Sequence, residues 1–249
     1  MLKRINWDKY FLKLQFDEPT HKYTLTDNNI QFTSVTQLLS TLKKDTFTDS
    51  FKQNYCNKHN LPYEYIDTLW KLKADIGALK GTEIHYMIES YFKWNIDMEV
   101  SILNTEAKQY FHNFLKDNKL RAIKLEYRVF DTDIKVAGSI DFLGYDLDRK
   151  CYCLLDWKSN KIINTSSREF LLEPVNNLQN TELNIYSLQL MLYKYILEKN
   201  IPELEIGYMK IVHLNSNNDN YKEYEVDYNK LKDSFHRFID YRVKQITTN

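Results

Sequence analysis

The stretch Gly138–Lys161, "GSIDFLGYDLDRKCYCLLDWKSNK", decides how the rest of the chain is interpreted. Apolar residues alternate on both sides of a polar turn, which predicts two antiparallel strands. Asp141, Asp156 and Lys158 lie within these apolar strands, where a plain core strand would carry no charge. These three charged residues therefore need a partner or a function.

Hairpin geometry relates the two aspartates to each other. If Asp148 and Arg149 form a two-residue turn, Asp141 lies directly opposite Asp156, with Cβ atoms about 5 Å apart on the same face. Two ionised carboxylates in this position repel each other, so a cation is expected beside them.

Lys158 lies two residues beyond Asp156 and shares its face, whereas Leu155 and Trp157 point to the other face. The ammonium group compensates part of the repulsion, and a divalent ion bridging both carboxylates would compensate more. Carboxylate oxygens suit Mg²⁺ or Mn²⁺. The alternative is an ion triad on a solvated face, but the apolar flanks favour central strands, where unpaired carboxylates are costly.

A second unusual pattern precedes the hairpin, in "GALKGTEIHYMIESYF". Gly77, Gly81, His85 and Glu89 recur every four residues and so form one row on a helix. Each interior glycine costs about 1 kcal/mol relative to alanine. The row makes sense if a neighbouring backbone or a nucleic-acid strand approaches closely while the His and Glu face something polar. A satisfied polar contact is the alternative for this pair.

A later helix, within "TELNIYSLQLMLYKYILEKN", carries Gln189 inside its apolar stripe, with Tyr193 one turn on. A buried glutamine needs hydrogen-bond partners. Either it bonds locally to the backbone, or it orients Lys158 or a phosphate.

The whole chain is interpreted as one α/β domain with a mixed sheet. Residues 1–120 are expected to be mainly helical, 121–215 to form the catalytic core, and 216–249 to add a closing strand and a C-terminal helix. The expected elements are a hairpin turning at 27–29, a helix capped at Thr33 or Ser34 and running to Leu42, a helix over 63–94 with a break near Gly81 re-capped by Thr82, a helix over 105–118, strands over 122–130, 134–145 and 150–158, an irregular stretch over 162–180, a helix over 181–200, strands over 205–214 and 221–228, and a helix over 229–244.

Composition narrows the function classes. Formal net charge is zero, from 34 basic and 34 acidic residues, so a polyanion must be met by a local basic surface. The 19 Tyr, 13 Phe and 4 Trp mainly imply core packing, with a few available for stacking on bases. Three cysteines argue against an iron–sulfur cluster or a structural zinc site and favour a reducing compartment.

The N-terminal segment breaks its apolar residues with charges, and no stretch approaches 18 uninterrupted apolar residues. The expectation is a soluble intracellular protein with no signal peptide and no membrane span, located in the cytoplasm or at a nucleoid or viral replication site.

Taken together, these motifs resemble the PD-(D/E)XK nuclease superfamily, specifically its RecB-like exonuclease branch. The order is "GTEIH…E" on a helix, "GSID" on a strand, "LLDWKSNK" on the next strand and "YSLQLMLYKYIL" on the following helix. Mitochondrial genome-maintenance exonucleases and phage or viral recombination nucleases share this arrangement. The resemblance implies a restriction-endonuclease-like core, with a mixed sheet flanked by helices.

The resemblance also assigns roles to individual residues. Catalytic positions fall on Asp141, Asp156, Lys158, Gln189 and Tyr193. Metal ligands fall on His85, Asp141, Asp156 and the backbone carbonyl of Trp157, with Glu126 at an acidic position seen in some members and Glu89 as a supporting partner of His85. Lys161, Arg168 and Lys194 are candidate phosphate contacts.

The implied activity is hydrolysis of phosphodiester bonds in DNA with one or two Mg²⁺ or Mn²⁺ ions. The expected enzyme is an exonuclease acting on DNA ends with single-stranded character, in replication, recombination or repair. The chain contains no G-x-x-x-x-G-K-[ST] loop, so a helicase motor would come from a partner chain, as would a polymerase or recombinase activity.

Three alternatives stay open: a structure-specific or restriction-type endonuclease, a non-catalytic DNA-binding protein on a nuclease fold, and a metabolic enzyme or adaptor.

Overall fold

A computed structural model describes residues 5–17, 20, 22–27, 30–44 and 48–248. Its elements in chain order are η1 (Trp7–Lys9), β1 (Leu14–Asp17), β2 (Lys22–Leu25), β3 (Gln31–Ser34), α1 (Val35–Ser40), α2 (Asp49–His59), α3 (Tyr63–Trp94), η2 (Ile102–Asn104), α4 (Thr105–Asp117), β4 (Leu120–Asp131), β5 (Val136–Asp146), β6 (Cys151–Lys158), α5 (Glu182–Asn200), β7 (Ile206–His213), β8 (Lys222–Glu225) and α6 (Tyr228–Thr247).

The strands form one mixed sheet in the order β1-β2-β3-β5-β6-β7-β8, with β4 paired to β5 outside this path. The β3–β5 and β6–β7 pairs are parallel, and the other pairs are antiparallel. The predicted α/β class with a mixed sheet is therefore confirmed. No helix in the described part of the chain is both long enough and apolar enough to cross a membrane.

Strand β5 is the pivot of the sheet. One of its edges pairs with β4 along its whole length, from Val136 to Asp146. The other edge pairs with β3 only at Val136 and Ala137, and with β6 only from Phe142 onward. Among the described residues, neither β3 nor β6 pairs with Gly138–Asp141, the "GSID" motif. This motif therefore borders a gap where β3 and β6 diverge.

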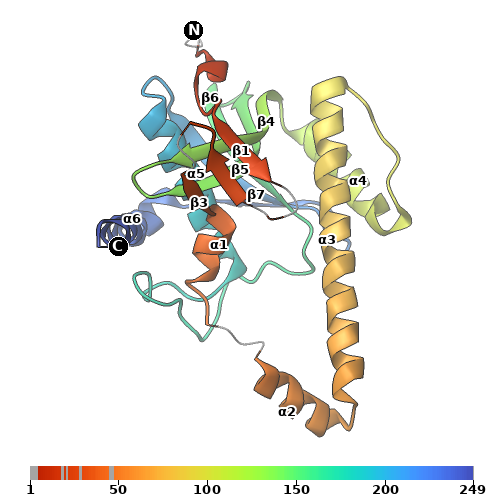
Figure 1. Cartoon of the computed structure of the whole chain (residues 1–249). Coiled ribbons are helices and arrows are strands. Elements are labelled where there is room, and N and C mark those ends of the chain that lie inside the picture. The colour runs from red at the N-terminus through yellow and green to blue at the C-terminus, as the bar shows by residue number, and fades with distance from the viewer. Residues whose placement is uncertain (1–4, 18–19, 21, 28–29, 45–47, 249) are drawn as a thin grey trace.

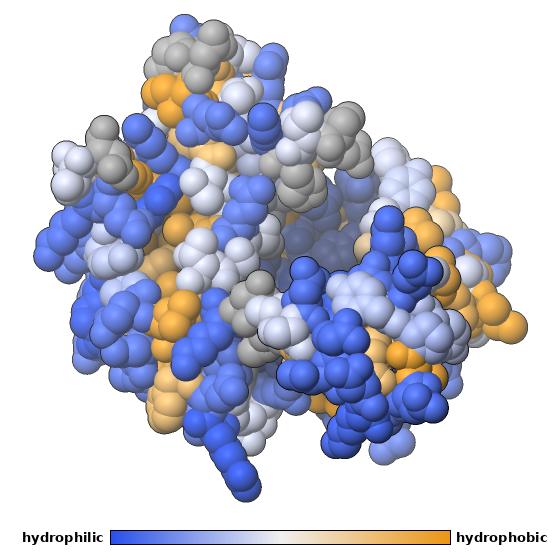
Figure 2. Space-filling view, turned by 60° about the horizontal axis from the view of Figure 1, so that its bottom comes forward, coloured by the Kyte–Doolittle hydropathy of each residue, from blue (hydrophilic) through white to orange (hydrophobic). Residues whose placement is uncertain are grey.

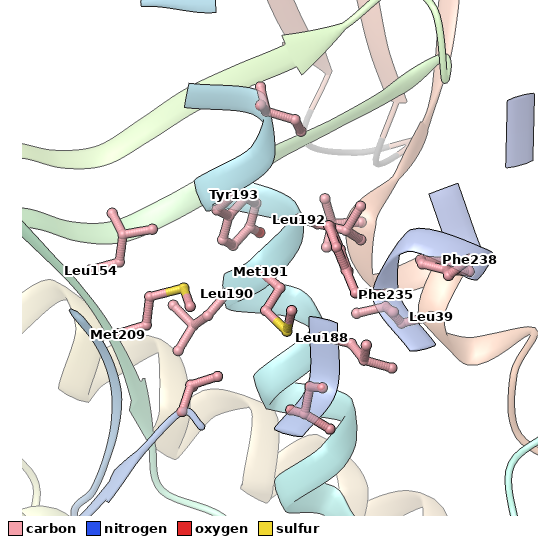
Figure 3. Packing of buried hydrophobic residues seen from close by; sticks show 14 of the residues in the cluster. Leu39, Leu154, Leu188, Leu190, Met191, Leu192, Tyr193, Met209, Phe235 and Phe238 are labelled. Atoms are coloured by element: carbon pink, nitrogen blue, oxygen red, sulfur yellow. The ribbon is translucent and has the colours of Figure 1, made fainter. Parts of the chain in front are cut away.

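Helices cover both faces of the sheet (Figure 1). On one face α1, α5 and α6 enclose the larger core, and Figure 3 shows Leu190, Met191 and Leu192 of α5 among side chains of the strands and of α1 and α6. On the other face α3 and α4 pack over a second core that includes Trp157. The N-terminal half of α3 continues beyond the sheet to α2 (Figure 1).

Alternation along β5 is interrupted at Asp141. Ile140 packs in the core beneath α5, whereas Phe142, two residues later, packs in the core beneath α3. Residues two apart on a regular strand would share one face. The backbone is therefore irregular where the sequence places its first strand carboxylate.

Several expected elements need correction. Helix α3 runs unbroken through Gly81, and the Thr82 hydroxyl donates to the Ala78 carbonyl instead of capping a new helix. Helix stability in this long segment therefore outweighs the glycine cost. The segment 1–120 is mainly helical, through α1–α4, but it also contributes β1–β3 to the sheet. The expected hairpin is β2–β3, and residues 28 and 29 of its turn lie outside the described residues.

The β5–β6 turn is longer than expected. The last ladder pair is Asp146 with Cys151, so the turn has four residues, not two. The register is nevertheless the predicted one, because Phe142 pairs with Leu155 as expected. This pair ends the ladder on the side away from the turn, and Asp141 is the next residue along β5. Ile134 and Lys135, expected in the strand, belong to the preceding turn.

The carboxylate of Asp146 organises this turn. It accepts hydrogen bonds from the backbone N–H of Asp148 and Arg149, at 2.9 and 2.8 Å, and from the Tyr208 hydroxyl at 2.7 Å. We expect Asp146→Ala to lower the free energy of unfolding by about 2–3 kcal/mol, because three donors, among them the buried Tyr208 hydroxyl, lose a charged acceptor. Urea unfolding at pH 7 measures this.

The matched control is Asp148→Ala, which removes a carboxylate that pairs only with the exposed Lys119 and should cost less than about 1 kcal/mol. Burial opposes ionisation of Asp146, but the hydrogen bonds outweigh it and lower its pKa. The stabilisation that the ionised Asp146 carboxylate gives is therefore fully present at pH values above its unfolded-state pKa of about 4. It is lost as the pH falls through the lower pKa of the folded state. Equal losses for both variants at pH 7 would refute the role of Asp146.

Candidate metal centre and active site

Three potential ligands from three elements meet at the gap in the sheet. His85 of α3, Glu126 of β4 and Asp141 of β5 each offer one atom, and these atoms lie within 4.8 Å of one another. His85 Nδ1 is 3.4 Å from Glu126 Oε1 and 3.7 Å from Asp141 Oδ2. An imidazole nitrogen and two carboxylates form a donor set that suits Mn²⁺ and, through the oxygens, Mg²⁺.

Glu126 is held in an unusual conformation. Its φ is 44°, in the left-handed region that a non-glycine residue in a strand rarely adopts. Such a conformation costs about 1–2 kcal/mol. The Ser139 hydroxyl donates to Glu126 Oε2 at 3.1 Å and holds the carboxylate near His85. Backbone strain of this kind, held in place by the surrounding structure, is concentrated at functional sites.

Asp141 and Trp157 connect the two diverging strands. The Trp157 N–H, which has no ladder partner on β5, donates to Asp141 Oδ2 at 2.9 Å. The Trp157 carbonyl lies 3.1 Å from His85 Nε2, which must carry the hydrogen because a carbonyl oxygen only accepts. This carbonyl therefore lies on the Nε2 side of the His85 ring, whereas Nδ1 faces Glu126 and Asp141.

Asp156 lies beside the cluster but is not one of its three members. Its Oδ2 contacts Lys158 Nζ at 2.5 Å, and its Oδ1 accepts from Gln189 Nε2 at 2.8 Å. Gln189 thus contacts Lys158 only through Asp156, which bonds to both. Glu126, which the sequence only suggested, is the second carboxylate of the three-residue cluster.

Tyr193 explains why a glycine begins the "GSID" motif. A Cβ added at Gly138 would lie 2.9 Å from the Tyr193 ring and 3.1 Å from Val35 Cγ2. The ring fills the space beside the gap and is almost fully buried (Figure 3). Tyr193 therefore packs against Gly138 and also hydrogen-bonds with Gln189.

Burial and proximity shift the pKa values of these groups. Burial lowers the pKa of His85, but Asp141 and Glu126 outweigh it and raise this pKa to about 9. Burial raises the pKa of Asp156 to about 6, although Lys158 opposes this change. Burial likewise raises the pKa of Asp141, against His85 and Lys158. The positive charges of His85 and Lys158 thus offset the negative charges of Asp141, Asp156 and Glu126 in a site that is partly shielded from water.

A cavity of about 690 Å³ opens beside the cluster. Its walls are the row of α3 that contains Gly77, Gly81 and His85, and the segments after β6 and β7. It is lined by four lysines and no carboxylate: Lys73, Lys80, Lys158 and Lys161. Figure 2 shows a hollow with a hydrophilic floor on this side of the molecule. The cavity therefore has a local positive charge, although the net charge of the chain is zero.

The other candidate residues are distributed unevenly. Lys161 lines the cavity, whereas Arg168 is exposed outside it. Lys194 lies in a different cavity, where it contacts Glu198 at 2.5 Å and the Ile206 carbonyl at 2.9 Å. The structure thus gives Lys194 a partner within the fold and separates it from the site.

Glu89 does not hydrogen-bond to His85. It lies 3.4 Å from Lys93 and lines a smaller cavity with His85 and Glu126. Sequence reasoning missed Tyr186, whose ring lies 4.7 Å from Lys158 Nζ, and Ser139, which holds Glu126. Tyr186 belongs to the apolar stripe of its helix, and Ser139 is part of the quoted motif, so both could have been found.

The residues present fit a divalent ion. Ligands at about 2.0–2.2 Å from an ion lie at most about 4.4 Å apart, so a 4.8 Å cluster needs only a small contraction. Hard oxygen donors and one imidazole match the ions that the sequence suggests.

No family model and no curated protein matches the chain. A solved structure titled "Crystal structure of SSO0001" matches with a TM-score of 0.31 and 15% sequence identity, over 83% of this chain and 74% of that chain. Similarity at this level carries no argument about function.

Proposed function

We propose that the protein is a metal-dependent nuclease that hydrolyses phosphodiester bonds in DNA. The observation that carries the proposal is the cluster of His85, Glu126 and Asp141 together with the Asp156–Lys158 pair, from which His85 and Lys158 line a basic cavity. Phosphodiester hydrolysis needs an activated water molecule and stabilisation of negative charge on the phosphate. Carboxylates and an imidazole that can hold a metal ion, and an ammonium group beside a surface suited to polyanions, can meet both needs.

The roles of the residues follow from their positions. His85, Glu126 and Asp141 would hold Mg²⁺ or Mn²⁺. When bound, such an ion polarises the phosphate and lowers the pKa of a water molecule. Lys158 reaches the cavity, where its ammonium group orients that water and offsets negative charge on the phosphate.

Asp156 and Gln189 fix the position of Lys158. Asp156 is 1% exposed, and its two oxygens contact Lys158 and Gln189. The Tyr186 ring supports the ammonium group from another side. A lysine held by several groups loses little freedom when substrate binds, which favours catalysis by positioning.

The glycine row supports a nucleic-acid strand as substrate. A Cβ at Gly77 would contact nothing within 4 Å, and one at Gly81 would make an ordinary 3.6 Å contact with Ser159 Oγ. The fold itself therefore requires neither glycine, contrary to one of the two sequence-based explanations. An approaching phosphodiester backbone, the other explanation, accounts for the open space beside a lysine-lined wall.

Salt dependence of binding tests the basic cavity. In the described structure, neither Lys73 nor Lys80 has an ion-pair partner, so both are available for phosphates. We expect Lys73→Ala/Lys80→Ala to weaken binding of a single-stranded oligonucleotide in Ca²⁺ or EDTA. The slope of log K against log salt should fall by about 1.4, since each neutralised phosphate contributes about 0.7. Fluorescence anisotropy at several salt concentrations measures this slope.

The matched control is Lys230→Ala/Lys232→Ala, which removes the same charge from exposed positions of α6. This variant should keep the wild-type slope. If both double variants change the slope equally, the cavity is not the binding surface.

Cleavage of end-labelled DNA tests the proposed activity. We expect products with Mg²⁺ or Mn²⁺ and none with EDTA. An exonuclease, which we propose, degrades linear single strands and leaves covalently closed circles intact. Nicking of the circles would instead identify an endonuclease, and absence of cleavage on all substrates would refute the nuclease assignment.

A further inference from the structure

Four consecutive backbone carbonyls, from Lys158 to Lys161, are all bound by the segment that begins at the end of β7. The four hydrogen bonds are Leu214 N to Lys158 O at 2.8 Å, Asn215 Nδ2 to Ser159 O at 2.6 Å, His213 Nε2 to Asn160 O at 2.6 Å and Asn217 Nδ2 to Lys161 O at 3.1 Å. Three of these donors are side chains, so their bonds depend on residue identity. We call His213, Asn215 and Asn217 the 213–217 clamp.

Lys158 pairs with His213 at the end of the β6–β7 ladder, but the three residues after it have little other support. The β5 ladder ends at Leu155, and β6 itself ends at Lys158. Residues 159–181 contain no helix or strand apart from an isolated bridge between Phe170 and Gln179. Regular pairing therefore cannot fix the backbone immediately after Lys158, and the clamp supplies the missing hydrogen bonds.

The clamp is itself built firmly into the fold. His213 is 2% exposed, and its Nδ1 accepts from Asn218 Nδ2 at 3.2 Å while Nε2–H donates to the held segment. The Asn218 carbonyl accepts from the Tyr110 hydroxyl of α4 at 2.7 Å. Asn215 Oδ1 accepts from the Asn217 N–H at 3.0 Å. Buried polar groups satisfied in this way make a rigid network.

The position of the held segment matters for the reaction. Lys158, Ser159, Asn160 and Lys161 all line the basic cavity, so the clamp holds one of its walls. A displacement of about 1 Å in a positioning group can reduce a rate by about 10²-fold.

We propose that His213, Asn215 and Asn217 are positioning residues, which hold the Lys158–Lys161 backbone so that Lys158 meets the scissile phosphate. This inference rests on the proposed function, because Lys158 must act in the reaction. It goes beyond that function by assigning a role to a loop that has no contact with the metal cluster.

Asn215→Asp tests the clamp with minimal change in shape. Aspartate keeps the acceptor for the Asn217 N–H but loses the donor to the Ser159 carbonyl and places a negative oxygen against it. The matched control is Asn220→Asp in the same loop. Asn220 only accepts, through Oδ1, from Tyr221 N and Asn113 Nδ2, so aspartate retains both bonds. The two variants carry the same added charge, but Asn215 lines the basic cavity and Asn220 does not. Asn215→Leu, which removes the donor without adding charge, is therefore measured beside them and should lose kcat to a similar extent.

We expect kcat for a single-stranded oligonucleotide to fall about 10–100-fold in Asn215→Asp, with KM within about twofold of the wild type. The Leu214 amide, which donates to the Lys158 carbonyl, should exchange with deuterium faster than in the wild type. Asn220→Asp should match the wild type in both measurements. His213→Gln, which keeps a donor, should retain most of kcat, whereas His213→Leu should lose as much as Asn215→Asp.

Equal kcat and equal exchange in Asn215→Asp and Asn220→Asp would overturn the clamp. So would a loss in His213→Gln as large as that in His213→Leu. If the wild type shows no metal-dependent cleavage, the proposed function fails. That outcome is seen in the wild type alone and so is distinct from failure of the clamp, which is seen only in the variants.

Discussion

Replacing Lys158 by methionine should reduce DNA cleavage by about 10³-fold while the protein stays folded. Methionine keeps much of the length and apolar stem of lysine but removes the ammonium group that reaches the cavity. Loss of one preorganised group that stabilises transition-state charge typically costs about 10²–10³-fold in rate. Single-turnover cleavage at saturating enzyme measures the chemical step directly.

The fold should survive because Asp156 can become neutral when Lys158 is absent, and it then leaves no unpaired charge in the interior. Its pKa is already raised to about 6, and without Lys158 it takes up a proton and keeps its hydrogen bond from Gln189. Thermal unfolding and oligonucleotide binding check this point. Lys161→Met, three residues on and also in the cavity wall, is the control and should lose less than about tenfold. Comparable losses for the two variants would remove Lys158 from the reaction.

Asp141→Asn should abolish both Mn²⁺ binding and cleavage. The substitution removes one of two carboxylates from the cluster, and a neutral amide oxygen is a much weaker ligand for a hard cation. The amide oxygen of the substituted side chain can still accept the Trp157 N–H, so the free energy of unfolding should change by less than about 1 kcal/mol. Calorimetric titration with Mn²⁺ provides a measurement independent of activity.

Glu89→Gln is the matched control for this prediction. It also removes a carboxylate, four residues from His85 on α3, from a side chain that pairs with Lys93 and lies outside the cluster. Its Mn²⁺ titration should match the wild type. Undiminished Mn²⁺ binding in Asp141→Asn would contradict the assignment of the metal centre.

Local patterns predicted much of this molecule. The two-residue period around Gly138–Lys161 correctly indicated two paired strands and their register, because alternation and a polar turn are properties of neighbouring residues. The same reasoning placed Trp157 on the face opposite Lys158, where it packs in the second core.

Other features depend on contacts between segments that are distant in sequence, so they could not be predicted from the pattern of neighbouring residues. The gap beside "GSID" exists because β3, from the N-terminal part, and β6 share one edge of β5. The attachment of Asp156 to Gln189 depends on how α5 packs on the sheet. The left-handed conformation of Glu126 and the 213–217 clamp have no periodic signature in the sequence.

Diffraction from crystals soaked in Mn²⁺ would show whether His85, Glu126 and Asp141 form a metal site. Anomalous scattering locates the ion without any assumption about activity. We expect one strong peak in contact with these three residues, at about 2.0–2.3 Å from their ligand atoms. A fully soaked crystal with no peak among these three residues, or with the ion bound elsewhere, would contradict this expectation.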